Sequence, residues 1–303
     1  MTSSEDIKII VEDYAVNSRS FSKKSKKPKK VDYYLQYIDS AKFFKKKDIE
    51  KSLSFIEKAL KNKENEKRNA VTYKLLADIY LYWKQYDLAV YNYKLSNQLK
   101  EDVNTKLALA NAQFLLKNFI VSEQIYQELT EEQLSNYEKI KVYEGFGDVN
   151  FALKKWDKAD EKYQKALQIS KDNLVTPKIT DLSSKIADVY AAQGNVNKAE
   201  NLFKNSLNLA EKENPKRALE EEEKVADFYN LNKRFDDEIE LRKKSLEKAK
   251  ISINSSKFKE KDSITSQKIN YKIGNAYILK EEYKNAIPFL QESKKDANQK
   301  NDI

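Results

Sequence analysis

Asp, Asn and Lys recur at fixed places along this sequence, and residues of these types can form a polar surface that grips another chain. The first set follows a small residue in seven segments and is Asp or Asn in six of them: Ala41, Asp78, Asn111, Asp148, Asp188, Asp227 and Asn275. The second set stands two residues before the small residue in the last three segments: Lys185, Lys224 and Lys272. Such side chains can hold the backbone or the termini of an extended peptide through charge-assisted hydrogen bonds. We therefore interpret these positions as a partner-binding groove.

The sequence lacks the residues that most catalytic and metal sites require. It has no His and no Cys, which excludes a histidine-based triad, a thiol nucleophile and the usual zinc ligands. It has no Gly-rich phosphate loop, and we expect the run Glu220–Glu223 to form a solvated helix face instead of an acid/base pair. We predict a protein that is not an enzyme, with no catalytic residues, no metal site and no cofactor.

The elements that position the groove are predicted to be helices. Of the 303 residues 35% are charged and 40% are hydrophobic, and only 4 Gly and 4 Pro are present, which disfavours a turn-rich β-sandwich. A pattern of small and bulky residues repeats seven times, in residues 36–59, 73–96, 106–129, 143–166, 183–206, 222–245 and 270–293. In the second copy Ala77 precedes Tyr80 by three residues and, after a break, Tyr86 precedes Ala89 by three. Residues at this spacing share one face of a helix, so each copy predicts two helices.

The two small residues of each copy predict where its helices cross. In the first helix they are Ser40, Ala77, Ala110, Gly147, Ala187, Ala226 and Gly274. In the second helix they are Ser52, Ala89, Ser122, Ala159, Ala199 and Ala286, and Glu238 is the exception in the sixth copy. Small side chains let two backbones approach closely, so each copy should fold as an αα-hairpin. One hairpin buries too little apolar surface to offset its ordering entropy, and we expect the hairpins to stack into an all-α solenoid.

This residue set resembles that of the tetratricopeptide repeat (TPR) family over roughly residues 33 to 296. The chain departs from the family pattern in two respects: the early Trp is absent from every copy, and the turn Gly is present only as Gly194. The resemblance implies a right-handed superhelix of about seven repeats, with a concave groove lined by the first helices. It also implies that the partner is a protein or a peptide.

Stacking of the hairpins should bring the acidic groove residues close to lysines of the next copy. The expected pairs are Asp148 with Lys185, Asp188 with Lys224, and Asp227 with Lys272. Two interpretations stay open. The charges grip a partner, or they neutralise one another on a solvated face, where each pair contributes about 0 to 1 kcal/mol. The carboxylate clamp that some TPR proteins use for C-terminal acids is disfavoured, because Asp78 stands where that clamp needs Asn.

The chain is predicted to contain an N-terminal segment with a basic linker, residues 1–32, and the solenoid, residues 33–303. Seven of its nine net positive charges lie in "RSFSKKSKKPKK", residues 19–30, which leaves a net charge of +2 for the rest. This stretch could contact phosphate or serve as a tether, and it contains no aromatic residue besides Phe21 on which bases could stack. We expect no nucleic-acid binding by the solenoid and no membrane span. The expected location is cytoplasmic, with a periplasmic sensor region as the alternative.

The scarcity of Gly, the richness in Lys, Asn and Ile, and the ending "SKKDANQKNDI" are similar to repeat regions of bacterial sensor histidine kinases, particularly those of the Bacteroidetes. This resemblance implies the sensory or scaffolding part of a two-component signal-transduction protein, a fragment whose kinase core follows residue 303. In the alternative, the chain is a free-standing adaptor that binds a peptide or a protein tail in its groove. A homodimer is compatible with both.

Deletion of residues 19–30 should abolish any affinity of the chain for DNA, because the remaining residues carry a nearly balanced charge. Fluorescence anisotropy with a labelled duplex, run on the full chain and on the deletion variant, measures this affinity. DNA binding that survives the deletion would contradict the expectation that the solenoid does not bind nucleic acid.

Overall fold

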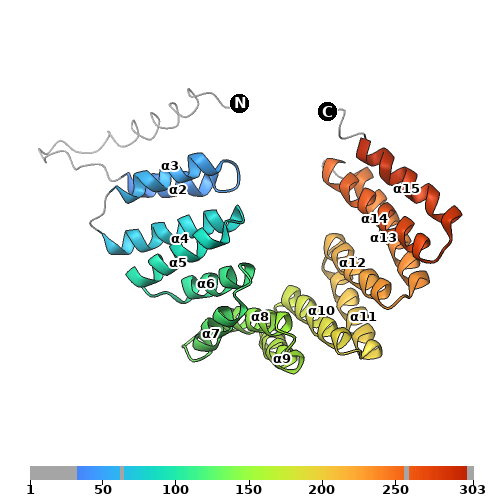
Figure 1. Ribbon diagram of the computed structural model, residues 1–303, viewed down its shortest axis with the longest axis horizontal. Helices are drawn as coiled ribbons and strands as arrows, with labels where there is room; N and C mark the ends of the chain where they lie inside the picture. Colours follow the sequence, from blue (N-terminus) through green and yellow to red (C-terminus); the bar gives the residue numbers. More distant parts are fainter. Residues whose placement is uncertain (1–32, 62–64, 256–258, 299–303) are drawn as a thin grey trace, which may run out of the picture. The chain divides into compact units, whose positions relative to one another are not determined.

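All regular structure in the described part of the chain is helical (Figure 1). The computed structural model describes residues 33–61, 65–255 and 259–298, which contain fourteen α-helices and no strand. The helices are α2 (Tyr34–Phe44), α3 (Ile49–Leu60), α4 (Glu66–Tyr82), α5 (Tyr86–Leu99), α6 (Val103–Leu115), α7 (Phe119–Thr130), α8 (Asn136–Ala152), α9 (Trp156–Asp172), α10 (Thr176–Ala192), α11 (Val196–Glu213), α12 (Pro215–Leu231), α13 (Phe235–Ser255), α14 (Lys259–Leu279) and α15 (Tyr283–Asn298). None of these helices is both long enough and apolar enough to cross a bilayer. The predicted all-α fold is confirmed.

The chain divides into two compact units, residues 1–62 and residues 63–303. The described part of unit 1 is one hairpin, α2–α3, and unit 2 contains six hairpins, α4–α5 to α14–α15. Within unit 2 the second helix of each hairpin packs against the first helix of the next one. This is the packing of an αα-hairpin solenoid. The boundary expected between residues 32 and 33 stays a prediction, because residues 1–32 lie outside the described part.

Polar caps define where several helices begin. The side chains of Asp48, Asn65, Asp102, Ser135 and Asn214 each accept a hydrogen bond from the backbone N–H three residues later, at the starts of α3, α4, α6, α8 and α12. Each bond satisfies one of the amide groups that the first turn of a helix leaves without a partner. Four of these five helices are the first helices of their hairpins.

The turns inside the hairpins of unit 2 use the left-handed conformation, although only one of them has Gly there. The residues with φ between +57° and +78° in these turns are Lys84, Lys117, Lys154, Gly194, Lys233 and Glu281. In the first of these turns the Gln85 N–H donates to the Tyr80 carbonyl at 2.9 Å, and the equivalent bond recurs in the other five. These bonds satisfy carbonyls at the end of the first helix. Backbone hydrogen bonds therefore hold the turn, and no Gly or Pro is needed to mark it.

In unit 2 the predicted crossing residues lie at the contacts between paired helices. Ala77 and Ala89 are both 0% exposed in the second hairpin. Where the crossing residue of the second helix is Ser, its hydroxyl bonds to the facing helix: Ser122 Oγ donates to the Ala110 carbonyl at 2.7 Å. The small side chain permits the close approach, and the hydroxyl adds a hydrogen bond to it.

In the first hairpin the prediction of Ser40 is wrong by one residue. Ala41 is 0% exposed and its carbonyl accepts a hydrogen bond from Ser52 Oγ at 2.8 Å, because the turn between α2 and α3 is one residue longer than the turn between α4 and α5.

The sixth hairpin of the chain, α12–α13, has a buried charged pair in place of the small crossing residue. The side chains of Glu238 and Arg242 are 2% and 4% exposed, and Arg242 Nε donates to Glu238 at 2.8 Å. The Asn230 amide donates to the other Glu238 oxygen at 2.7 Å. Charged groups are tolerated in an interior only when they are paired and hydrogen-bonded, and these bonds explain why Glu238 is accommodated.

The run Glu220–Glu223 is not the solvated helix face that the sequence led us to expect. Glu221 and Glu222 are 0% and 1% exposed. Glu221 accepts a hydrogen bond from Ser206 on α11, and Glu222 accepts one from Ser245 on α13. Consecutive residues point about 100° apart around a helix, so four in a row encircle α12. Because α12 packs against both α11 and α13, two of the four must be buried.

Replacing Lys84 by Gly should stabilise the chain by about 0.5–1 kcal/mol, because Gly adopts a φ of +59° without the steric cost that Lys has. The midpoint of thermal unfolding should rise. The control is Lys94→Gly in the exposed middle of α5, which should lower the midpoint because Gly costs about 1 kcal/mol inside a helix. Equal shifts for the two variants would contradict a strained turn.

Candidate partner-binding groove

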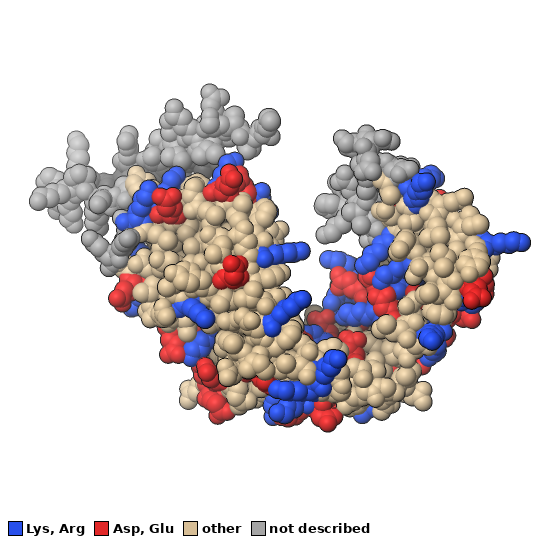
Figure 2. Space-filling model, in the orientation of Figure 1, with Lys and Arg blue, Asp and Glu red and all other residues tan. Residues whose placement is uncertain are grey.

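The predicted groove positions lie on the first helices of the hairpins. In Figure 1 the hairpins of unit 2 follow a curved row, with α6, α8, α10 and α12 on its inner side and α7, α9, α11 and α13 on its outer side. Figure 2 shows acidic and basic side chains interleaved around the hollow on the side of α12 and α14. We call the surface formed by the first helices of unit 2 the groove. The remaining position, Ala41 of unit 1, was wrongly expected to face the groove, because it is fully buried where α2 crosses α3.

The first expected pair, Asp148 with Lys185, is present. Lys185 Nζ lies 2.5 Å from the Asp148 carboxylate and 3.3 Å from that of Glu144, so α10 is tied to α8. Burial of Lys185 works against its charged form, but the two carboxylates outweigh burial and raise the pKa of Lys185 above its ordinary value. Asp148 also accepts a hydrogen bond from the Tyr163 hydroxyl at 2.7 Å. Its carboxylate is therefore shared between α9 and α10.

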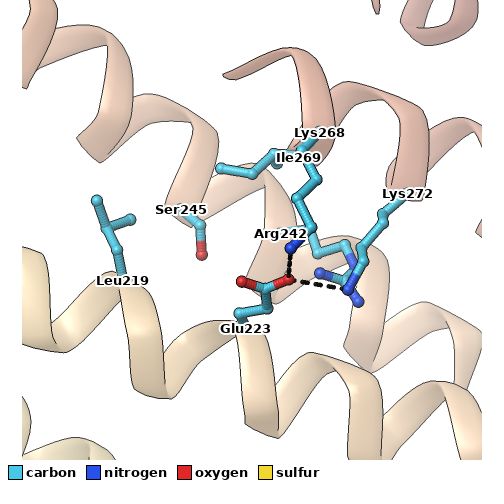
Figure 3. Close-up of a pocket in the computed structure, with 7 residues that line it drawn as sticks. All are labelled: Leu219, Glu223, Arg242, Ser245, Lys268, Ile269 and Lys272. Carbon is cyan, nitrogen blue, oxygen red and sulfur yellow. Dashed lines mark hydrogen bonds and ion pairs between the residues drawn. The ribbon is translucent and has the colours of Figure 1, made fainter. Parts of the chain in front are cut away.

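The third expected pair, Asp227 with Lys272, is also present, at 2.7 Å. Figure 3 shows Lys268 and Lys272 of α14 reaching the Glu223 carboxylate of α12, at 2.6 Å and 3.0 Å. Burial alone would raise the pKa of Glu223, but the hydrogen bonds from both lysines hold that pKa below its ordinary value. Arg242 of α13 also binds Asp227. The acids of α12 thus connect two later helices.

The middle pair, Asp188 with Lys224, does not form, and this expectation is wrong. Lys224 Nζ lies 2.6 Å from the carboxylate of Glu221, one turn earlier on α12. Glu221 is fully buried, and a buried carboxylate without a counter-ion costs more free energy than one that reaches solvent. Asp188 reaches solvent and has no ion pair with another described residue. The protein around it nevertheless hinders its hydration and raises its pKa to about 6.

The N-terminal end of the groove lacks the pairing lysines of its later helices. Asp78 on α4 accepts a hydrogen bond from Tyr93, and Lys74 lies 3.5 Å from it. Asn111 on α6 and Asn275 on α14 are exposed, and each amide can both donate and accept. Where α10, α12 and α14 have their pairing lysines, α6 and α8 have Ala108 and Gly145. The pairs between first helices that involve these lysines are therefore confined to α8–α14.

Side chains of the second helices donate hydrogen bonds to three groove aspartates. These donors were not predicted from the sequence. They stand fifteen residues after the groove aspartates, and the pairs are Tyr93 to Asp78, Tyr163 to Asp148 and Arg242 to Asp227. The repeat pattern contains the signal, because each donor lies four residues after the crossing residue and hence on the helix face that meets the first helix. In the fifth hairpin of the chain, α10–α11, the residue fifteen positions after Asp188 is Phe203, whose side chain has no hydrogen-bond donor.

The groove residues fall into two groups. Those tied into pairs between hairpins are Asp148, Lys185, Asp227 and Lys272. Those in exposed positions without a partner on another hairpin are Asn111, Asp188, Lys224 and Asn275. Asp78 is held within its own hairpin by Tyr93. Each interpretation of the pattern therefore fits a different group. The paired residues join hairpins, and the exposed residues can offer polar atoms to a partner.

Comparison with solved structures identifies the type of fold. The chain is similar to RapI in its apo form, with a TM-score of 0.60 and 17% identity, over 89% of this chain and 99% of that chain. It is similar to a signal-transduction ATPase with a tetratricopeptide repeat sensor, PH0952 from Pyrococcus horikoshii, with a TM-score of 0.61 and 16% identity over 87% and 43% of the two chains. It is also similar to a putative kinesin light chain with nearly identical TPR-like repeats from Podosopora anserina, with a TM-score of 0.54 and 15% identity over 65% and 96%. The fold is that of a TPR solenoid.

No protein-family model and no curated protein sequence matches the chain. At the identities above, the likeness is one of fold. In a TPR solenoid the first helices form one continuous surface, and here that surface carries every groove position of unit 2.

Replacing Tyr163 by Phe should destabilise the chain by about 1.5–3 kcal/mol, because it removes a hydrogen bond to the Asp148 carboxylate. Burial and the neighbouring Asp148 charge raise the pKa of Tyr163, so its hydroxyl stays a donor at neutral pH. The change should lower the urea concentration at the unfolding midpoint. The matched control is Tyr91→Phe on the exposed face of α5, which should have little effect. Equal midpoints for the two variants would contradict a stabilising hydrogen bond from Tyr163 to Asp148.

Proposed function

We propose that the groove of unit 2 binds an extended segment of another protein and that the chain acts as an interaction scaffold. The observation that carries this proposal is the row of accessible polar side chains on successive first helices: Asn111, Asp188, Lys224 and Asn275. Side-chain amides can hydrogen-bond to both the N–H and the C=O groups of a peptide backbone. Such contacts give affinity for an extended backbone, while contacts to its side chains select the sequence.

Successive first helices are close enough for one extended segment to contact more than one of them. Asp148 of α8 pairs with Lys185 of α10, and Asp227 of α12 pairs with Lys272 of α14, so side chains of neighbouring first helices reach each other directly. An extended chain advances about 3.3 Å per residue, and a segment of several residues can therefore pass from one first helix to the next.

Apolar side chains supply further contact area at the N-terminal end of the groove. Val71 and Tyr82 on α4 are 52% and 47% exposed, and Leu115 on α6 is 37% exposed. Val71, Asp78 and Tyr82 are seven and four residues apart, a spacing that places them on one side of α4. We propose that this end takes apolar side chains of the partner, while the middle takes polar ones.

We further propose that the binding event is sensory, within a bacterial two-component signal-transduction protein in the cytoplasm. The resemblance of the repeats to those of sensor kinases supports this form of the proposal, as does the likeness of fold to a protein with a tetratricopeptide repeat sensor. A bound segment would favour one packing of the hairpins over another and so shift a population that a neighbouring module can detect.

Selection of random peptides displayed on phage against the full chain tests the proposal. Peptides with a shared motif should be enriched, and Asn111→Ala should weaken their binding about tenfold, which corresponds to ~1.4 kcal/mol for the lost amide contacts. Asn205→Ala on the exposed side of α11 is the control and should leave affinity unchanged. Absence of any enriched motif, or equal affinities for the two variants, would refute groove binding.

A further inference from the structure

One groove aspartate lacks the donor that its counterparts have. Where the other groove aspartates receive a hydroxyl or guanidinium donor from the second helix, the fifth hairpin has Phe203. Phe203 is 1% exposed, and its ring centroid lies 5.0 Å from that of Phe228, so the ring is fixed inside the contact between hairpins. Asp188 therefore receives no hydrogen bond from this position of the second helix, whereas Asp78, Asp148 and Asp227 each receive one.

The lysines nearest to Asp188 are bonded to other carboxylates. Lys185, on the same helix, lies 2.5 Å from Asp148. Lys224, on α12, lies 2.6 Å from the buried carboxylate of Glu221. Moving either lysine to Asp188 would leave its present partner without a counter-ion, and for the buried partner that loss is costly.

Asp188 and the ion pairs nearest to it therefore contain one more acid than bases. The acids are Glu144, Asp148, Asp188 and Glu221, and the bases are Lys178, Lys185 and Lys224. Each lysine is bonded to one of the other three acids, so the surplus charge belongs to Asp188. The protein around Asp188 raises its pKa to about 6, which leaves the carboxylate ionised at neutral pH. A carboxylate partly removed from water attracts a cation more strongly than one in bulk solvent does.

We infer that Asp188 is the place where the groove binds an ammonium or guanidinium group, the head of a Lys or Arg side chain in the bound segment. This inference rests on the proposed function and adds one required residue type to the partner. The carboxylate accepts charge-assisted hydrogen bonds from the cationic head. The partner thereby supplies the donor that Phe203 cannot.

The hairpin α4–α5 shows which substitution would give Asp188 a hydrogen-bond donor from its own hairpin. Ala77 and Tyr93 stand where the fifth hairpin has Ala187 and Phe203, and the Tyr93 hydroxyl binds Asp78. Phe203→Tyr should therefore place a hydroxyl beside Asp188 without changing any charge. That hydroxyl would compete with a bound cation for the carboxylate.

The test is a titration of the full chain, isotopically labelled for NMR, with Nα-acetyl-lysine methylamide at pH 7.5. The neutral analogue Nα-acetyl-norleucine methylamide is the matched probe. Backbone amide signals of Ala187, Asp188 and Val189 should shift with the lysine probe and not with the norleucine probe. Asp188→Asn and Phe203→Tyr should each weaken the response at least tenfold, whereas Asp87→Asn, an exposed acid on α5, should leave it unchanged.

The pH dependence provides a second readout. Affinity for the lysine probe should fall about tenfold for each pH unit below 6, since binding requires the ionised carboxylate. The groups that face Asp188 are Lys185 on its own helix, Tyr163 on α9, and Glu221 and Lys224 on α12. The raised pKa of Lys185 keeps that lysine charged over this range, and the dependence should disappear in Asp188→Asn.

Equal shifts with the two probes, or a response in Asp188→Asn like that of the unmodified chain, would overturn this inference. Phage-selected peptides that lose affinity in Asn111→Ala but not in Asp188→Asn would also overturn it while leaving the proposed function intact. Failure of peptide selection together with a positive lysine titration would have the opposite meaning: the cation site stands and the extended groove does not.

Discussion

The close approach of two helix backbones at their smallest side chains is the contact on which each hairpin depends. Ala77 against Ala89 has no exposed surface, and where Ser replaces Ala its hydroxyl bonds to the facing backbone. The same contact positions the groove. Because consecutive residues lie about 100° apart on a helix, a crossing residue that points into the hairpin leaves the next residue pointing toward its edge. A second-helix residue such as Tyr93 can then reach that next residue, as it does with Asp78.

Charged pairs link successive hairpins in one direction. Between α8 and α10, between α10 and α12, and between α12 and α14, the acid stands on the earlier first helix and the base on the later one. The shortest of these contacts are Asp148 with Lys185, Asp181 with Arg217, and Glu223 with Lys268. Pairs that reach solvent add little stability. Their consistent direction gives neighbouring hairpins complementary surfaces, which favours one register over its alternatives.

The buried acids of α12 have a consequence for the groove. Glu221 lies in a contact with α11, and it requires a counter-ion because an isolated buried carboxylate is costly. Lys224 meets that requirement and is thereby withdrawn from Asp188. The structural demand of one hairpin contact thus leaves a carboxylate of the neighbouring hairpin accessible to a partner.

The sequence alone was sufficient for the hairpins, the crossing residues of unit 2, the placement of the recurring Asp, Asn and Lys residues on the first helices and two of the three charged pairs, because these depend on spacing along single helices and on the step from one copy to the next. It was not sufficient for the partner of Lys224, the burial of Glu221 and Glu222, or the second-helix donors. Each of these depends on competition among groups that only packing brings together. A lysine within reach of two carboxylates binds the one that has lost more water, and the tertiary structure alone determines which one that is.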